Sequence, residues 1–259
     1  MVTRRVDLNA DMGEGFGAWS MGDDAALLDI VTSANIACGF HAGDPEVMAR
    51  TMAAAAARGV GIGAHPGFAD LQGFGRRRMD LSSETLRAQI LYQLGAASAM
   101  ARAAGQRLAH VKLHGALANM VSEDQDLAQC CYGAVAAFDP ALTVVAIAAT
   151  AGERAARDLG LSVACEIYAD RAYNDDGTLV DRRQEGAVLH DPDMAADRVV
   201  AMLSEGAIIA RSGRRLPTRI DTICVHGDTA EAVAMAGVLR TRLMAADIVV
   251  RRLPVCGSQ

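Results

Sequence analysis

The sequence predicts a (β/α) barrel of the α/β class, and two observations lead to this prediction. Short runs of β-branched residues alternate with longer helical patterns, which indicates repeated βα units and a parallel sheet. Polar residues follow most of the predicted strands at their carboxyl ends, where a parallel barrel gathers its loops into one site. No linker, charge block or low-complexity segment divides the chain. We therefore expect residues 1–259 to form a single domain.

Seven segments have the composition of buried strands, and an eighth apolar run follows near the end of the chain. The seven predicted strands are Val6–Asn9, Ser33–Cys38, Val60–Ala64, His110–Lys112, Thr143–Ala148, Val163–Tyr168 and Thr222–Val225. The eighth run, Asp247–Val250, is expected either to close the barrel or to pack beside it.

Helix start signals lie between these strands. Asp44-Pro45 and Asp191-Pro192 each place a capping side chain before a proline at the first helical position. The segments Ser122–Gln125 and Asp228–Glu231 fit a capping box, in which the first residue caps the helix that follows.

Composition and charge exclude several classes of protein. Hydrophobic residues make up 51% of the chain and charged residues 22%, which is typical of a globular protein with an aliphatic core. The net charge of −6 argues against nucleic acid or anionic membrane as the main partner, and no wider basic face supports the Arg76–Arg78 run. The six cysteines show no paired metal spacing, and neither a secretion signal nor a membrane-spanning apolar run is present. We expect a cytoplasmic protein that binds neither nucleic acid nor membrane.

The polar residues at the strand ends form the candidate site. They are Asn9, Asp11 and Glu14 after the first strand, His41 and Asp44 after the second, His65 at the third, Lys112 and His114 at the fourth, Asp170, Arg171 and Tyr173 after the sixth, and His226 and Asp228 after the seventh. Four of the six histidines belong to this set, whereas random placement would scatter them. We therefore predict that these residues converge on one active site.

Some of these residues also have a structural interpretation. Asp44 stands where a helix N-cap is expected, and a single histidine at a strand end often has a structural role. Cys38 and Cys224 closely precede His41 and His226, so a Cys-His nucleophile pair is an alternative. Both cysteines fit equally well in a strand core.

The donor atoms at three strands suit either metal binding or acid–base chemistry. Asp11, His65 and His114 offer oxygen and imidazole ligands that a divalent transition metal accepts. Without a metal, the same residues could serve as general acid, general base and oxyanion donor. Both alternatives stay open, because the residues are far apart along the chain.

Anion binding is predicted at two arginines. Arg77 and Arg171 lie beside loops where an anionic substrate could be held in a fork geometry, whereas Arg76 and Arg78 are expected to face solvent. The chain has no G-x-x-x-x-G-K-[ST] loop, and the glycines of Gly13–Gly17 lack the spacing of a dinucleotide-binding turn. The sequence therefore offers no familiar cradle for ATP.

Several long motifs occur in order across nearly the whole chain. They are DLNADMGEGFG at 7–17, ANIACGFHAGDP at 34–45, GAHPGF at 63–68, GFGRR at 73–77, VKLHGAL at 111–117, ADRAY at 169–173 and VHGD at 225–228. Together they resemble the LamB/YcsF family, which comprises the A subunits of bacterial 5-oxoprolinases. The resemblance implies a seven-stranded (β/α) barrel similar to those of glycoside hydrolases and polysaccharide deacetylases. It also implies cleavage of 5-oxo-L-proline to L-glutamate coupled to ATP hydrolysis, in a complex with B and C subunits.

The resemblance carries site residues over by position. The matching positions are Asp7, Asn9, Asp11, Glu14, His41, Asp44, His65, Arg77, Lys112, His114, Asp170, Arg171, His226 and Asp228. The residues expected to be catalytic are Asp11, His41, His114 and Asp170, and those expected to bind substrate are Asn9, Glu14, Arg77, Lys112, Arg171 and His226. In deacetylase-like barrels an Asp and two His bind a metal, and Asp11, His65 and His114 have a similar placement.

Two departures from the family pattern leave the substrate open, and two other functions remain as alternatives. Leu113 and Ala118 stand where the family usually has Pro and Tyr, which could change the substrate. One alternative is a metal-dependent amide or sugar hydrolase, or a deacetylase, that acts alone. Another is a non-catalytic subunit that binds substrate for its partners, although the clustering of titratable groups favours an enzyme.

Overall fold

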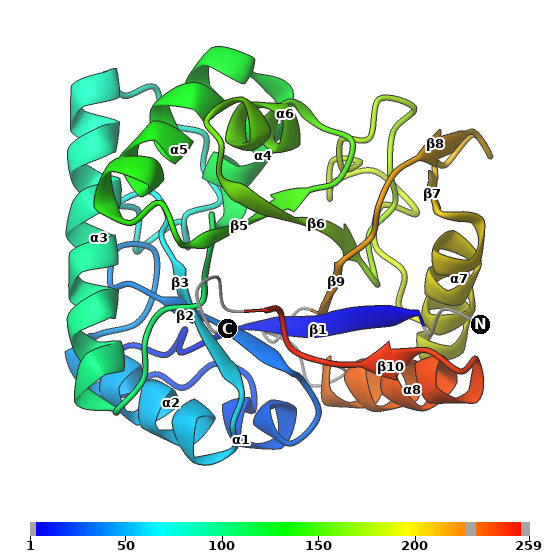
Figure 1. Cartoon of the computed structure of the whole chain (residues 1–259), viewed down its shortest axis with the longest axis horizontal. Helices are drawn as coiled ribbons and strands as arrows, with labels where there is room; N and C mark the ends of the chain where they lie inside the picture. Colours follow the sequence, from blue (N-terminus) through cyan, green and yellow to red (C-terminus); the bar gives the residue numbers. More distant parts are fainter. Residues whose placement is uncertain (1–3, 226–231, 255–259) are drawn as a thin grey trace.

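Seven parallel strands close into a barrel in the computed structural model, which describes residues 4–225 and 232–254 (Figure 1). The ring runs in the order β1 (Arg5–Met12), β2 (Ser33–Ala37), β3 (Gly61–His65), β4 (His110–Lys112), β5 (Thr143–Ile147), β6 (Ser162–Tyr168) and β9 (Thr222–Val225). Pairing of β9 with β1 closes it. The predicted seven-stranded (β/α) barrel is confirmed, and its strands coincide with the seven predicted segments to within a few residues.

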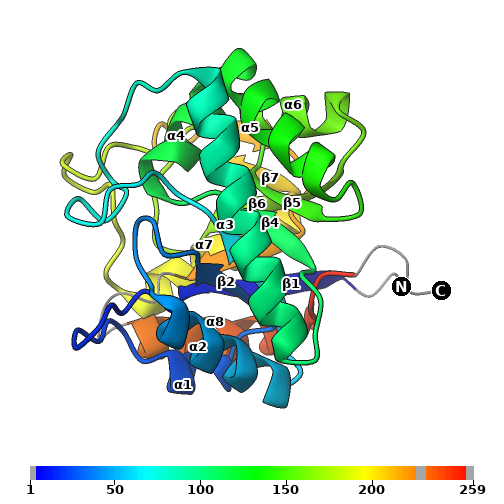
Figure 2. The ribbon, with the colours of Figure 1, turned by 90° about the vertical axis from the view of Figure 1, so that its left-hand side faces the viewer.

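Helices cover the outside of this ring (Figures 1 and 2). They are α1 (Asp24–Leu28), α2 (Pro45–Ala57), α3 (Ser83–Ala103), α4 (Gly115–Glu123), α5 (Gln125–Phe138), α6 (Ala151–Asp158), α7 (Pro192–Glu205) and α8 (Ala232–Ala245). In the described part of the chain, none of these helices combines the length and the apolar character that crossing a membrane requires.

The predicted helix starts agree with the structure at two of the three places that it describes. The side chains of Asp44 and Asp191 accept backbone N–H bonds at the starts of α2 and α7, as expected. The prediction that Ser122 caps a helix is wrong. Ser122 lies inside α4 and its hydroxyl donates to the Asn119 carbonyl, whereas Asp124 has extended backbone angles and caps α5. Asp228–Glu231 lies outside the described residues.

The remaining strands do not belong to the ring. The eighth predicted run contributes β10 (Val249–Val250), which pairs with the first two residues of β1 and does not close the barrel. β7 (Ala207–Ile209) and β8 (Arg215–Pro217) form an antiparallel hairpin after α7. This hairpin was not predicted, because three-residue strands are too short to show a periodic pattern.

Residues of β1 alternate between two environments, because successive side chains of a strand point to opposite faces. Leu8, Ala10 and Met12 belong to the apolar core, while Asp7 and Asn9 make hydrogen bonds to other ring strands. The inward face of β1 is therefore polar, and its outward face packs in the apolar core.

Gly63 illustrates how tightly this interior is packed. A Cβ atom added at Gly63 would lie 2.1 Å from Nε2 of His110, a buried side chain on the neighbouring strand β4. We expect Gly63→Ala to lower the free energy of unfolding by about 1–3 kcal/mol, because overpacking displaces side chains and backbone. Urea unfolding followed by circular dichroism measures this change.

Gly95→Ala on α3 is the matched control. A Cβ atom there meets nothing within 4 Å, and the residue is exposed within the helix. Alanine should raise the free energy of unfolding by up to about 1 kcal/mol through its helix propensity. Equal midpoints for the Gly63 variant and the wild-type chain would contradict the close packing of His110.

Candidate active site and metal centre

A cavity of about 740 Å³ opens where the ring strands end. Its lining includes Asp11, His65, Lys112, His114 and Tyr168, which come from β1, β3, β4 and β6 or directly follow them. Loops at this end carry the active site in (β/α) barrels, because all the parallel strands present their carboxyl ends there. Of the residues predicted to converge, the structure therefore brings Asp11, His65, Lys112 and His114 to one cavity.

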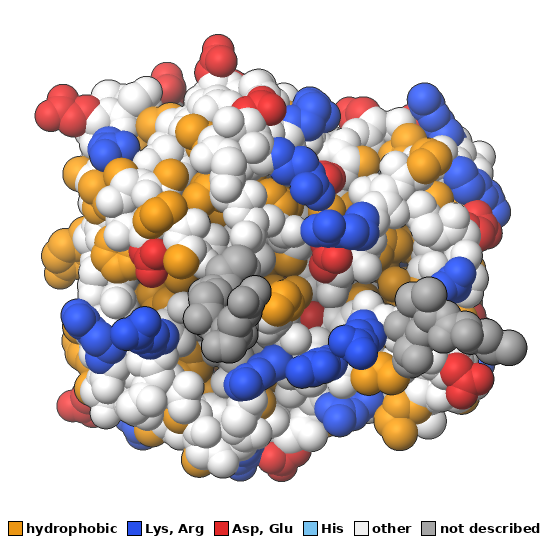
Figure 3. All heavy atoms as spheres, in the orientation of Figure 1, with side chains coloured by type: hydrophobic (Ala, Val, Ile, Leu, Met, Phe, Trp, Pro, Cys, Tyr) orange, Lys and Arg blue, Asp and Glu red, His pale blue; other side chains and the backbone are white. Residues whose placement is uncertain are grey.

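A second cavity of about 800 Å³ lies at the starts of β1, β5 and β6. Five arginines line it, namely Arg5, Arg157, Arg219, Arg251 and Arg252. Figure 3 shows one face of the molecule, with several arginine side chains around its middle, since Lys112 is the one lysine of the chain and is buried. Asp7 and Asp221 also line this second cavity, but none of the histidines in the described part of the chain does, so the clustered histidines lie at the other end.

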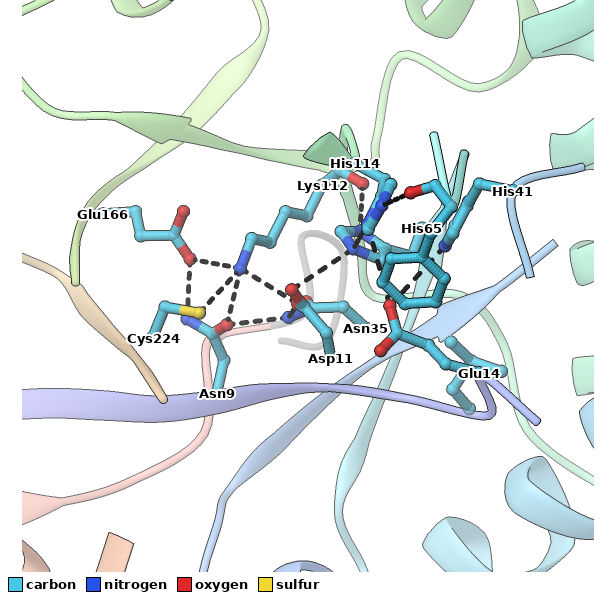
Figure 4. Close-up of polar contacts among 12 residues, drawn as sticks. Asn9, Asp11, Glu14, Asn35, His41, His65, Lys112, His114, Glu166 and Cys224 are labelled. Carbon is cyan, nitrogen blue, oxygen red and sulfur yellow. Dashed lines mark hydrogen bonds and ion pairs between the residues drawn. The ribbon is translucent and has the colours of Figure 1, made fainter. Parts of the chain in front are cut away.

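Three histidines and one glutamate form a buried cluster at the floor of the first cavity (Figure 4). His114 Nδ1 lies 3.0 Å from His65 Nε2 and 3.7 Å from Glu14 Oε1. His41 Nε2 lies 3.6 Å from the same Glu14 oxygen, and the His41 ring stacks on His114 at 3.7 Å with an angle of 4° between the planes. One potential ligand atom from each residue lies within 4.8 Å of the others, so the cluster could hold a metal ion.

Glycines make room for these rings. Gly75 has φ of +60°, and a Cβ atom added to it would come within 2.7 Å of the His41 Cβ and 2.8 Å of the His114 Cδ2. At Gly67 the added atom would lie 2.8 Å from His41 Nδ1. The glycine-rich motifs around His65 and Phe74 thus serve to pack the imidazoles closely.

The environment keeps two of the clustered imidazoles, those of His41 and His114, neutral. Burial lowers the pKa of His114 to about 3, and neighbouring His65 adds to this effect. Burial also lowers the pKa of His41 well below its usual value, with His114 and His65 adding to the shift. A neutral imidazole has a lone pair that can accept a proton or ligate a metal.

A second cluster surrounds Lys112, directly beside the first (Figure 4). The Lys112 ammonium lies 3.0 Å from Asp11 Oδ1, 2.9 Å from Glu166 Oε1 and 2.9 Å from Cys224 Sγ. Burial by itself would lower the pKa of Lys112, but Asp11, Cys224 and Glu166 together raise it well above its usual value. Lys112 is therefore a buried cation compensated by two carboxylates.

Asp11 connects the two clusters. Its Oδ1 accepts hydrogen bonds from Lys112 and from Asn35, and its Oδ2 lies 3.4 Å from His65 Nε2. Asn9 lies deeper in the barrel, with its amide donating to Glu166 and Thr222 and its carbonyl accepting from Asn35. Asn9 thus orients the network beneath the cavity and does not line it.

The other predicted residues occupy varied positions. Arg171 is buried and lines the cavity, with its guanidinium donating to the Val180 carbonyl. Arg77 pairs with Asp70 outside the lining, whereas Arg76 and Arg78 are exposed as expected and line the mouth. Two more predicted residues lie elsewhere: Asp44 caps α2, and half-buried Asp170 is not in the lining.

His226 and Asp228, both predicted on the loop after β9, lie outside the described residues. For the alternative nucleophile pair of Cys224 and His226, the structure therefore describes only the cysteine. Burial raises the pKa of Cys224 well above its usual value and that of Cys38 to about 12. Because the thiolate is the reactive form, neither cysteine has the environment of a nucleophile.

Sequence reasoning missed three members of the network. Glu166 and Asn35 are polar residues inside otherwise apolar strands, and His110 lies at the start of its strand, away from the end where the site is predicted. His110 Nε2 lies 2.8 Å from Asn35 Oδ1, and Glu166 pairs with Lys112 across the barrel. A lone charged residue in a buried strand was the available signal for Glu166.

The fold and this site define a parallel (β/α) barrel with a buried acid–base cluster at its carboxyl end. The chain belongs to the LamB/YcsF family, whose model matches residues 6–256. A protein from Ruegeria pomeroyi, named as the A subunit of 5-oxoprolinase, is 61% identical over 92% of this chain and 94% of its own length. A protein of the same name from Gluconobacter oxydans is 53% identical over 98% of this chain and 100% of its own length.

Solved structures agree with the fold. The lactam utilization protein from Thermus thermophilus has a TM-score of 0.90 and 44% identity, covering 96% of this chain and 100% of that one. The catalytic domain of a peptidoglycan N-acetylglucosamine deacetylase from Eubacterium rectale has a TM-score of 0.52 and 10% identity, covering 99% and 91%. At that identity the likeness concerns the barrel architecture alone.

Proposed function

We propose that this chain is the A subunit of an ATP-dependent 5-oxoprolinase, a hydrolase that opens 5-oxo-L-proline to L-glutamate in complex with B and C subunits. The observation that carries the proposal is the sequence identity of this chain, 61% and 53% over nearly full length, to two proteins named as A subunits of 5-oxoprolinase. The cavity adds acid–base groups suited to hydrolysis. The name of the Thermus relative, a lactam utilization protein, supports a cyclic amide as the substrate.

The chemistry of a lactam explains the need for ATP. A five-membered lactam is a stable amide, so its carbonyl carbon must be activated before water attacks it. Phosphorylation of the lactam oxygen supplies this activation. Water then adds to the carbon, the C–N bond breaks as the nitrogen takes up a proton, and a second water releases phosphate from the resulting acyl phosphate.

Asp11 is placed to move the protons in this sequence. Lys112 and Asn35 both donate to its Oδ1, while its Oδ2 lies beside His65 at the cavity floor. In the proposed reaction Asp11 accepts a proton from the attacking water and passes it to the departing nitrogen. Lys112 acts as a positioning residue, because it holds the Asp11 carboxylate in place from within the barrel.

Arginines at the cavity mouth suit the anionic groups of the reaction. Arg76, Arg78 and Arg171 all line the cavity, and each guanidinium offers several donors in a planar fork. We propose that they attract the substrate carboxylate and the phosphate that is transferred. The chain lacks a P-loop motif, so we assign ATP binding to the assembled complex and not to this cavity alone.

Reconstitution tests the proposal directly. We expect the purified chain, mixed with its B and C subunits, ATP and 5-oxo-L-proline, to release glutamate and ADP in equal amounts. Mixtures that lack ATP, or any one of the three subunits, should release none, because activation and ring opening are coupled. Chromatographic measurement of glutamate and ADP gives both quantities.

Two other results would replace the proposal. Hydrolysis of an acetylated sugar or an amide by the chain alone, without ATP, would indicate the stand-alone hydrolase that the metal-capable cluster also suits. Unchanged turnover by the full complex after loss of both Asp11 and His114 would indicate a subunit that only binds substrate. Absence of glutamate from a complete, folded complex would contradict the 5-oxoprolinase assignment.

A further inference from the structure

The hydrogen bonds of His65 and His114 determine which nitrogen of each ring has the lone pair. His65 Nδ1 lies 2.8 Å from the Lys112 carbonyl oxygen, and His114 Nε2 lies 2.8 Å from the Phe74 carbonyl oxygen. A carbonyl oxygen only accepts, so both of these nitrogens must carry hydrogen. In neutral rings, His65 Nε2 and His114 Nδ1 therefore have lone pairs and no proton.

These two lone-pair nitrogens lie 3.0 Å apart. Neither of them can donate to the other, so the contact is not a hydrogen bond between neutral rings. Two nitrogens bound to one ion, each about 2.0–2.1 Å from it, are roughly 2.8–3.4 Å apart at octahedral or tetrahedral angles. The separation thus fits a shared cation. The carbonyl contacts fit too, because metal-binding histidines commonly donate their other N–H to a carbonyl or carboxylate.

The geometry also selects the third ligand. Glu14 Oε1 lies 3.7 Å from His114 Nδ1 and belongs to the same buried group of donor atoms. His41 belongs to this group as well, but its ring is parallel to that of His114 at 3.7 Å. An imidazole binds a metal in the plane of its ring, so an ion in the plane of His114 lies far outside the plane of His41. His41 therefore packs against His114.

We propose that Glu14, His65 and His114 bind one divalent transition-metal ion at the floor of the cavity. Two imidazoles and one carboxylate suit such an ion and leave coordination positions open toward the cavity. When bound, the ion would polarise a carbonyl or phosphoryl oxygen, or a water molecule. This inference goes beyond the proposed function, because it concerns the isolated chain and needs neither ATP nor 5-oxo-L-proline.

Metal binding by the isolated chain tests the inference. We expect the chelator-treated wild-type chain to take up one equivalent of Zn²⁺ or Co²⁺, measured by elemental analysis after gel filtration and by the visible absorption of Co²⁺. His65→Gln and Glu14→Gln should each weaken binding at least tenfold, because changes even to outer contacts of metal ligands cost about 10–100-fold. Circular dichroism confirms that each variant is folded.

Two variants serve as matched controls. His190→Gln removes a histidine outside the cluster and should bind metal as the wild-type chain does. Asp11→Asn should retain the ion, because Asp11 is not among the four residues whose donor atoms group together, and asparagine keeps an oxygen beside His65. If a ligand variant does not fold, the wild-type chain decides, since Zn²⁺ must then raise its unfolding temperature by mass action.

A wild-type chain that retains neither Zn²⁺ nor Co²⁺ would overturn the proposal. Full binding by a folded His65→Gln or Glu14→Gln variant would overturn the assignment of ligands. Neither result bears on glutamate release by the complete complex, so failure of the metal site and failure of the 5-oxoprolinase assignment are distinguishable.

Discussion

Lys112→Met is expected to lower the free energy of unfolding by about 3–5 kcal/mol, because removing one partner of a buried ion pair leaves the other charge uncompensated. Lys112 is 2% exposed and lies within 3.0 Å of both Asp11 and Glu166. Methionine has a similar length but no charge, so it cannot compensate these two carboxylates. Urea unfolding, followed by circular dichroism, measures the change.

The exposed pair between Arg215 and Glu205 provides the control. Its N–O distance of 2.8 Å resembles those of Lys112, but the Arg215 side chain is 51% exposed. Arg215→Met should cost less than about 1 kcal/mol, because water and salt screen an exposed pair. Similar losses in the free energy of unfolding for the two variants would show that Lys112 does not compensate the buried charges of Asp11 and Glu166.

Asp11→Asn is expected to lower kcat of the complete 5-oxoprolinase complex by about 10²–10⁴-fold, the range that a positioned general acid–base group contributes. Asparagine keeps the size of the side chain and an acceptor for Lys112 and Asn35, but it cannot take up the proton of an attacking water. KM for 5-oxo-L-proline should change little, because the lost interaction belongs to the transition state. Steady-state glutamate release separates the two constants.

Asp44→Asn controls for the substitution itself. Asp44 caps α2 through the N–H groups of Glu46 and Val47, and asparagine is an equally good N-cap. Turnover by this variant should match that of the wild-type complex. An Asp11→Asn complex with unchanged kcat would remove Asp11 from proton transfer, and one with only a raised KM would make it a substrate-binding residue.

The strand pattern was predictable because it is local. The inward residues Asp7, Asn9 and Asp11 alternate with Leu8 and Ala10 in the sequence itself, and the same period of two reappears as the polar interior and the apolar exterior of the ring. Helix caps were predictable wherever an aspartate precedes a proline. The prediction of a cap at Ser122 was wrong because α4 continues through this residue. Where α4 ends depends on how α4 and α5 pack and not on the four residues of the motif.

The sequence by itself determined that histidines and carboxylates follow successive parallel strands, and parallel strands bring their carboxyl ends to the same rim. Only the tertiary structure decided which of them touch. It placed Arg76 and not Arg77 at the cavity, joined Glu166 to Lys112, and turned the lone pairs of His65 and His114 toward each other. The physical reason is that contacts across a barrel depend on strand register and on where each loop returns. Neighbouring residues in the chain do not encode either one.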